Sequence, residues 1–398
     1  MTTAVESWLR KRSAKVLPWF PEPGSGAGTE YAWRGVAVVV PLLDEEFTPT
    51  LESLTTAWNY AAPYTDDRTP EEEVRVYCVV NNRRNERAEI KERNRALLAY
   101  LNDAAGREGA SIASRHGIRL VPIDAASEGR ELPEGEGAGF ARKIGMDYAL
   151  SQGASVIACM DGDTLISKNY FQVLYDFRQT ALEADAGCLS FLHQSGETPE
   201  AERAIRSYEL FLSGHSRKLK ECGSIYYQTA LTPRIVCTRE AYMQSGGMNT
   251  RTAGEDFYFL QGLVKICYGK GRLPVELPAA VYPSARISNR TPFGTGQKIS
   301  ELMAGNPLPA YSDFVYEQIK AFISLMNEHI QENRSDLPGK IRERLPEVCV
   351  FLEANSFFQD WEKIQAAAPD AERLRRAFHF WFDGLRIIRL IHYLQTHP

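Results

Sequence analysis

The sequence predicts an α/β protein built on a mostly parallel, Rossmann-type sheet. Between residues 36 and 160, short apolar segments alternate with longer helical patterns, an order that produces parallel strands joined by right-handed crossovers. From about residue 307 onward, apolar residues recur at helical spacing only, which predicts a helical C-terminal region. With 398 residues, the chain is long enough for a large core and for more than one domain.

The predicted elements begin with residues 36–41, whose sequence VAVVVP is typical of a strand buried on both faces. Three more apolar runs have the same character, at residues 74–80, 118–123 and 156–160. Helical patterns occupy the intervening segments 48–60, 86–100 and 139–150. Further helices are expected at 257–264, 314–333, 345–358 and 374–394.

These patterns divide the chain into three expected parts. Residues 1–33 are expected to form an N-terminal arm that docks through Trp8, Trp19, Phe20 and Trp33, since a disordered arm rarely carries so many aromatic side chains. Residues 34–300 are expected to form the α/β domain, and residues 301–398 a helical C-terminal domain.

The composition excludes several classes of protein. A net charge of -5 does not favour a nucleic-acid binder, which is usually basic over a whole domain. The seven cysteines are scattered without a C-x-x-C pair, which favours buried, reduced thiols over a zinc site or a disulfide framework. Because neither a secretory signal pattern nor an apolar run of about 20 residues is present, a cytoplasmic protein is expected.

Polar side chains follow the predicted strands, at the edge where ligands of parallel sheets bind. We therefore expect one crevice to contain Asp44, Asn81, Asn82, Asp161 and Asp163. The pair in Asp161-Gly162-Asp163 can hold a divalent cation, and Gly162 permits a phosphate to approach the backbone closely.

A second acidic pair, Glu255-Asp256, follows Gly246-Gly247 and opens a predicted helix. A carboxylate there can act as a base. A cation that stabilises a diphosphate leaving group and a base that activates a hydroxyl are the two requirements of metal-dependent sugar transfer.

Five motifs, in this order, resemble those of family-2 glycosyltransferases. They are Val38–Glu46 (VVVPLLDEE), Val79-Val80-Asn81-Asn82, Phe140-Ala141-Arg142-Lys143-Ile144-Gly145, Met160-Asp161-Gly162-Asp163, and Gly246-Gly247-Met248 followed by Gly254-Glu255-Asp256. The resemblance covers roughly residues 34–290. Two positions depart from the usual pattern, because Asp44 replaces an Asn and Asn81-Asn82 replaces the Asp that many relatives use to bind the base or ribose.

The resemblance implies a GT-A-like fold and an inverting hexosyltransferase that moves a sugar from a nucleoside diphosphate to an acceptor hydroxyl. It implies that Asp161 and Asp163 coordinate Mn²⁺ or Mg²⁺, that Asp256 is the catalytic base and that Glu255 supports it. The residues implied to bind the nucleotide are Pro41, Leu42, Asp44, Glu45, Asn81, Asn82, Arg142 and Gly162.

The acceptor is expected to meet the segment 195–233, including Tyr226 and Tyr227, and also Gly247. It could be a saccharide, a lipid-linked molecule or a small molecule. The loop from residue 282 to 298 carries Arg286, Arg290 and Lys298, which could close on the donor diphosphate as a lid.

Two other functions are open at this point. A non-catalytic nucleotide-sugar-binding relative would keep the fold without the reaction. A HAD-type phosphatase also carries a D-x-D after an apolar strand, but its motif requires Thr or Val where this chain has Leu165. The aromatic, basic segment 378–394 could contact a membrane surface, although a core helix or a contact between identical subunits is favoured.

Overall fold

The computed structural model describes residues 3–21, 33–61, 74–106, 118–180, 184–287, 294–332 and 336–397. The chain divides into two compact units. The first comprises Met1–Arg206, Ala230–Cys267 and Arg272–Ala304, and the second comprises Ser207–Thr229, Tyr268–Gly271 and Gly305–Pro398. Each unit has a hydrophobic core of its own.

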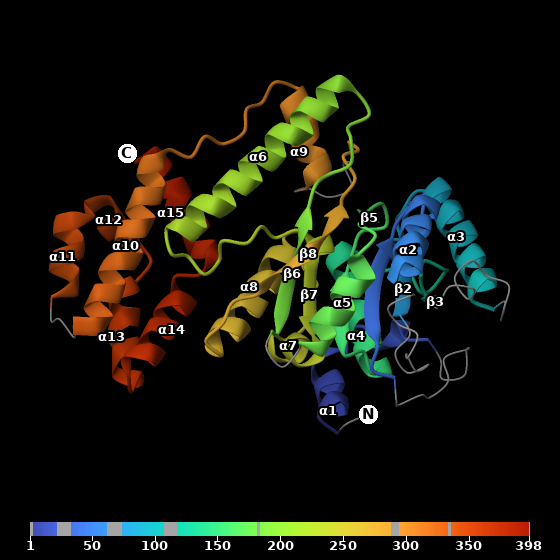
Figure 1. The fold of residues 1–398 in the computed structure, drawn as a ribbon, viewed down its shortest axis with the longest axis horizontal. Helices are drawn as coiled ribbons and strands as arrows, with labels where there is room; N and C mark the ends of the chain where they lie inside the picture. The colour runs from blue at the N-terminus through green and yellow to red at the C-terminus, as the bar shows by residue number, and fades with distance from the viewer. Residues whose placement is uncertain are drawn as a thin grey trace. The chain divides into compact units, whose positions relative to one another are not determined.

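The first unit is built on an eight-stranded sheet with the strand order β3-β2-β1-β4-β7-β6-β8-β5 (Figure 1). All of these strands run in one direction except β7 and β5. The prediction of a mostly parallel, GT-A-like α/β sheet is therefore confirmed. The strands are β1 (Val36–Leu42), β2 (Val74–Asn81), β3 (Ile118–Ala125), β4 (Val156–Cys159), β5 (Leu165–Ile166), β6 (Ala186–Phe191), β7 (Ile235–Thr238) and β8 (Val275–Tyr282).

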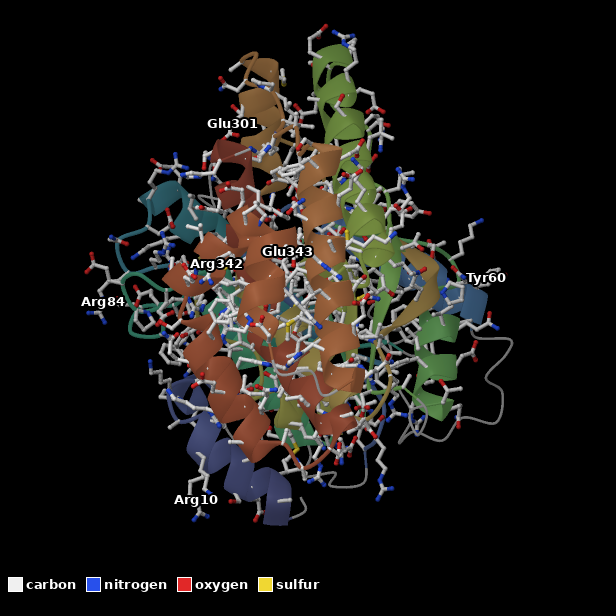
Figure 2. The ribbon with its side chains drawn as sticks, turned by 90° about the vertical axis from the view of Figure 1, so that its left-hand side faces the viewer. Arg10, Tyr60, Arg84, Glu301, Arg342 and Glu343 are labelled. Carbon is white, nitrogen blue, oxygen red and sulfur yellow. The ribbon has the colours of Figure 1, made fainter. Side chains whose placement is uncertain are left out.

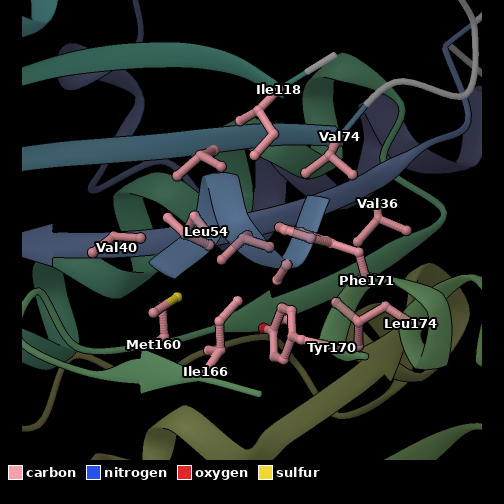
Figure 3. Packing of buried hydrophobic residues seen from close by; sticks show 14 of the residues in the cluster. Val36, Val40, Leu54, Val74, Ile118, Met160, Ile166, Tyr170, Phe171 and Leu174 are labelled. Atoms are coloured by element: carbon pink, nitrogen blue, oxygen red, sulfur yellow. The ribbon is translucent and has the colours of Figure 1, made fainter. Parts of the chain in front are cut away.

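Helices cover both faces of this sheet, because alternate residues of each central strand point to opposite sides. Val36, Val38 and Val40 belong to a core shared with side chains of α2, α3 and α5, part of which Figure 3 shows. Helix α4 packs against β1 and β2 on the side of Val39 and Val79. The α-helices of this unit include α1 (Thr3–Arg12), α2 (Thr48–Ala61), α3 (Ala88–Gly106), α4 (Ala138–Gln152), α5 (Tyr170–Gln179), α7 (Arg239–Gln244), α8 (Glu255–Gly269) and α9 (Thr295–Met303). The last two residues of α8 belong to the second unit.

A glycine allows the close packing of α4. A Cβ atom on Gly145 would lie within 2.9 Å of Val79 Cγ2 and closer still to Val39 Cγ1. Because α4 can lie this close to the sheet, its N-terminal turn, which carries Arg142, reaches the edge where β1 and β4 end.

The register brings the carboxyl ends of the parallel strands to one edge. Leu42 pairs with Val80, Asn81 pairs with Ala125, and Val39 pairs with Cys159. The polar residues that follow β1, β2 and β4 therefore emerge at the same edge of the sheet.

The N-terminal residues dock on this unit through aromatic side chains. In α1 (Thr3–Arg12), the Trp8 indole donates a hydrogen bond to Met243 O at 2.9 Å and its ring contacts Tyr242. After the short 3-10 helix η1 (Leu17–Trp19), Phe20 packs edge-on against Tyr148 of α4.

The second unit is helical, as the sequence predicted. It contains α10 (Asp313–Glu332), α11 (Leu337–Arg344), α12 (Pro346–Ala354), α13 (Phe357–Ala367), α14 (Ala371–Trp381) and α15 (Gly384–Thr396). Helix α11 is amphipathic, because Ile341 is buried whereas Arg342 and Glu343 are exposed (Figure 2). Helix α6 (Pro199–Glu221) begins in the first unit and ends in the second.

Two helices that the sequence predicted as continuous are each divided in two. The predicted helix 345–358 breaks between α12 and α13, where Ser356 adopts the left-handed conformation with φ 55°. The predicted helix 374–394 breaks before Gly384, where Asp383 caps α15 by accepting a hydrogen bond from Arg386 N. Apolar residues recur at helical spacing on both sides of each break, so this spacing does not show where one helix ends and the next begins.

All seven cysteines are buried thiols without a disulfide. Among the residues that the structure describes, no helix is long and apolar enough to cross a membrane.

Candidate functional site

Six carboxylates gather where the parallel strands end. Asp44 and Glu45 follow β1, Asp161 and Asp163 follow β4, and Glu255 and Asp256 begin α8. We call these six side chains the carboxylate cluster. They come from three separate parts of the sequence, and two arginines join four of them into two groups.

Arg142 holds the first group together. From the first turns of α4, its guanidinium donates to Glu255 Oε1 through Nη1 and to Asp161 Oδ1 through Nη2. The side chain of Arg142 is only 8% exposed and that of Glu255 only 10%, so solvent screens this interaction weakly. The arginine therefore joins the D-x-D turn to the start of α8. A contact of Arg142 with the nucleotide, which the resemblance implies, stays a prediction.

Arg286 holds the second group together. Its Nη2 lies 2.7 Å from both carboxylate oxygens of Glu45 and 2.9 Å from Asp163 Oδ2. Gly162 makes room for this arrangement, since a Cβ atom there would meet Glu45 Cγ at 2.8 Å and Leu42 Cδ2 at 2.7 Å. The exit of β1, the D-x-D turn and the segment after β8 are thus held in one place.

Asp256 differs electrostatically from its neighbours. Burial and, after it, the adjacent Glu255 carboxylate raise the pKa of Asp256 from 3.8 to about 6, although the charge of Arg142 opposes the shift. The backbone N–H of Phe257 donates to Asp256 Oδ1 at 2.8 Å, which fixes one oxygen of the carboxylate. A carboxylate with a pKa close to neutrality is suited to accept a proton during catalysis.

Amide side chains tie the strand exits together. Asn94 of α3 is fully buried, donates to Asn81 O and to Asn82 Oδ1, each at 3.0 Å, and accepts from Asp44 N at 2.9 Å. The Nδ2 group of Asn81 donates to Leu42 O at 3.2 Å and to Val79 O at 3.0 Å. The donors of Asn81 are therefore engaged with the backbone.

Asp44 lies at a turn in the left-handed conformation with φ 56°, which Asp adopts more readily than most residues. Its carboxylate accepts a hydrogen bond from Arg93 Nε. The side chains of Asn81 and Asn82 are buried, and Asn94 joins both residues to the backbone of Asp44 at the exits of β1 and β2.

A divalent cation fits this site if a substrate completes its coordination. In the described ranges, no three or more His, Cys, Asp or Glu side chains form a group that could hold a metal ion. Mg²⁺, however, is commonly bound by one or two carboxylates together with phosphate oxygens of the substrate. Asp161 and Asp163 suit that role, since they flank one turn and their side chains are 35% and 25% exposed.

The structure also places the other residues that the sequence singled out. Lys298 is on α9, where it pairs with Glu301 at 2.6 Å, and Gly247 lies against the Trp8 ring with φ 78°. Tyr226 and Tyr227 belong to the second unit, where they pack against its core. Pro41 is the next-to-last residue of β1, and Arg290 is outside the described residues.

Two residues that shape the site were absent from the sequence predictions. Asn94 belongs to a polar helix and to no motif, although it bonds three residues at the strand exits. Gln194, just after β6, donates to Asp163 O at 2.7 Å and to Tyr282 O at 2.8 Å. The burial of Asn94 distinguishes it from the other polar residues of its helix, but this burial is visible only in the structure.

Comparisons with known proteins gave likenesses of structure. No family model matches the sequence, and no curated protein matches it. The structure is similar to the crystal structure of S. aureus TarS in complex with UDP-GlcNAc, with a TM-score of 0.38 and 15% identity over 91% of each chain. It is also similar to glucosyl-3-phosphoglycerate synthase from Mycobacterium tuberculosis in complex with Mg²⁺ and UDP, with a TM-score of 0.32 and 16% identity over 73% of this chain and 87% of that one. At these identities the likeness is one of fold alone.

Proposed function

We propose that this chain is a metal-dependent, inverting glycosyltransferase that moves a sugar from a nucleoside diphosphate to an acceptor hydroxyl. One observation carries the proposal. The D-x-D carboxylate Asp161 and the Glu255-Asp256 pair are linked through a single buried arginine, at the edge where parallel sheets bind their ligands. A leaving-group site and a base are therefore close to each other.

Asp256 would act as the general base. With a pKa of about 6 it is mostly ionised at neutral pH, yet it is basic enough to take up a proton as the hydroxyl attacks. The acceptor oxygen would form its bond to the anomeric carbon while the bond from that carbon to the phosphate oxygen breaks. The proton passes to Asp256, and the electron pair of the broken bond remains on the departing diphosphate.

Asp161 and Asp163 would hold the cation that neutralises the diphosphate. A cation would lessen the repulsion between the diphosphate and the carboxylate cluster, whose members also interact with Arg93, Arg142 and Arg286. When bound, Mn²⁺ or Mg²⁺ supplies charge stabilisation of the leaving group. Arg286, already beside Asp163, would be placed to add a second positive charge.

The nucleoside would lie at the exits of β1 and β2. Asp44 and Glu45 border that region. The side-chain amides of Asn81 and Asn82 hold the strand ends in place through hydrogen bonds to backbone carbonyls. Arg142 then acts by orienting Asp161 and Glu255. Acceptor contacts by Tyr226, Tyr227 and Gly247, and a lid that includes Arg290 and Lys298, remain predictions.

A panel of nucleoside diphosphates with Mn²⁺ tests the proposal first. We expect one of UDP, GDP, ADP and dTDP to raise the melting temperature, because a ligand that binds only the folded state stabilises it. The corresponding sugar nucleotides would then be incubated with candidate acceptors and the released nucleotide measured. A protein that binds the sugar nucleotide but never transfers the sugar, so that no free nucleotide is formed, would be the non-catalytic relative. A protein that binds no nucleoside diphosphate would contradict the proposal.

A further inference from the structure

Gln194 connects two parts of the site that are distant in sequence. It lies just beyond β6, and its side-chain amide donates one hydrogen bond to Asp163 O at 2.7 Å and another to Tyr282 O at 2.8 Å. The first acceptor belongs to the D-x-D turn. The second is the last residue of β8, where the segment that carries Arg286 begins.

The backbone of Gln194 is anchored independently of its side chain. Its N–H donates to Pro283 O at 2.9 Å, and its carbonyl accepts from Arg206 Nη2 at 3.3 Å. The same Arg206 nitrogen donates to His193 O at 3.0 Å, and Arg206 is itself held by Glu202. Removing the amide group should therefore leave the chain in place at residue 194 while releasing Asp163 and Tyr282.

The two bonds of Gln194 close a ring of contacts. The Gln194 amide bonds both Asp163 O and Tyr282 O. Arg286, four residues after Tyr282, contacts Asp163 Oδ2 at 2.9 Å and so completes the ring. Both amide hydrogens of Gln194 point to carbonyl oxygens. An aliphatic side chain of equal length would leave those two part-buried oxygens without this donor.

We propose that Gln194 is a positioning residue, which holds Asp163 and Arg286 in the relative placement that a metal-bound diphosphate requires. This inference rests on the proposed function, in which Asp163 binds the cation and Arg286 faces the diphosphate. Gln194 touches neither group itself. It acts by fixing the backbone on both sides of the binding position, so that both charges are in place before the ligand arrives.

The test compares Gln194→Met and Gln194→Asn with the wild type. Met keeps the length but has no donor, whereas Asn keeps the amide and reaches only one of the two carbonyls. The dissociation constant of Mn²⁺ together with the best-binding nucleoside diphosphate would be measured by calorimetry at 15 °C. Circular dichroism would confirm that each variant is folded at that temperature.

We expect Gln194→Met to weaken binding of the metal-bound diphosphate about ten-fold and Gln194→Asn to fall between it and the wild type. The pH dependence of turnover should stay that of the wild type, since Asp256 is untouched. Gln395→Met is the matched control, because Gln395 also donates to a backbone carbonyl, Ala310 O at 2.8 Å, but lies in the helical unit. It should leave binding unchanged.

Equal affinities for the wild type and Gln194→Met would overturn the inference while leaving the proposed function intact. A purely structural role would lower the melting temperature without changing the affinity at 15 °C. If Gln194→Met does not fold, Gln194→Asn decides alone, and wild-type affinity in that variant counts against the inference. Failure of the wild type to bind any nucleoside diphosphate with Mn²⁺ would instead remove the proposed function, and this inference with it.

Discussion

Replacing Asp256 by Asn should separate catalysis from binding. The substitution keeps the shape of the side chain and removes the oxygen that would accept the proton. Loss of a general base typically costs ~10²–10⁴-fold in rate. Because the pKa of Asp256 is raised to about 6, kcat/KM of the wild type should fall about ten-fold for each pH unit below 6 and level off above pH 7. Asp256→Asn should lose this pH dependence together with the rate.

The same substitution should stabilise the protein at neutral pH. A carboxyl with a pKa of about 6 when folded and 3.8 when unfolded binds its proton more tightly in the folded state. Its stabilising contribution is therefore complete below pH 3.8 and is lost as the pH rises through 6. About two pH units correspond to at most about 3 kcal/mol, and partial exposure to solvent reduces this figure. Asn does not ionise, so the variant should unfold at higher urea than the wild type at pH 7.5.

Glu255→Gln is the matched control in the adjacent position. Glu255 accepts a hydrogen bond from the buried Arg142, so neutralising it should destabilise the protein by about 1–3 kcal/mol. Two neighbouring carboxylates should thus change stability in opposite directions. Turnover of Asp256→Asn within three-fold of the wild type, or urea stability reduced as in Glu255→Gln, would refute the assignment of Asp256 as the base.

Two further perturbations test the arrangement around this base. Arg286→Ala should bind Mn²⁺ alone more tightly, because the guanidinium no longer pairs with Asp163. The same variant should bind the metal-bound nucleoside diphosphate about ten-fold more weakly, because it lacks the positive charge beside the diphosphate. Calorimetry measures both affinities, and a change of both in the same direction would contradict the placement of Arg286. Gly145→Ala should lower the melting temperature, since overpacking against Val39 and Val79 costs about 1–3 kcal/mol and exceeds the helix-propensity gain of about 1 kcal/mol. Gly262→Ala, whose Cβ would meet Ser245 at an ordinary 3.5 Å, should be neutral or stabilising, and a lower melting temperature there would contradict this account of α4 packing.

Strands β1, β2 and β4 were predictable because each is buried on both faces. Their runs at residues 36–41, 74–80 and 156–160 contain a single charged side chain, Arg75, a pattern typical of central parallel strands. Strand β3 lies at the edge of the sheet and is only partly buried, but its run at residues 118–123 is also mainly apolar. Strands at the other end of the sheet were not identified. Strand β5 has only two residues, and β8 alternates exposed and buried positions at one edge, so neither has a distinctive apolar run.

The site was predictable at the level of its carboxylates and not at the level of their partners. Asp161, Asp163, Glu255 and Asp256 follow recognisable motifs at strand and helix ends. The pairing of Arg286 with Glu45, however, spans 241 positions of the sequence, and only the fold brings the two together. Asn94 and Gln194 were missed for the same reason, since a single amide side chain has no sequence signature.

In the proposed function, Asp161 and Asp163 hold a cation that binds the donor diphosphate. Calorimetry of the best-binding nucleoside diphosphate, with Mn²⁺ and then with EDTA, tests it most directly. We expect EDTA to weaken binding by at least ten-fold, and we expect Asp163→Asn in Mn²⁺ to behave like the wild type in EDTA while remaining folded. Equal affinity with Mn²⁺ and with EDTA in the wild type would contradict it.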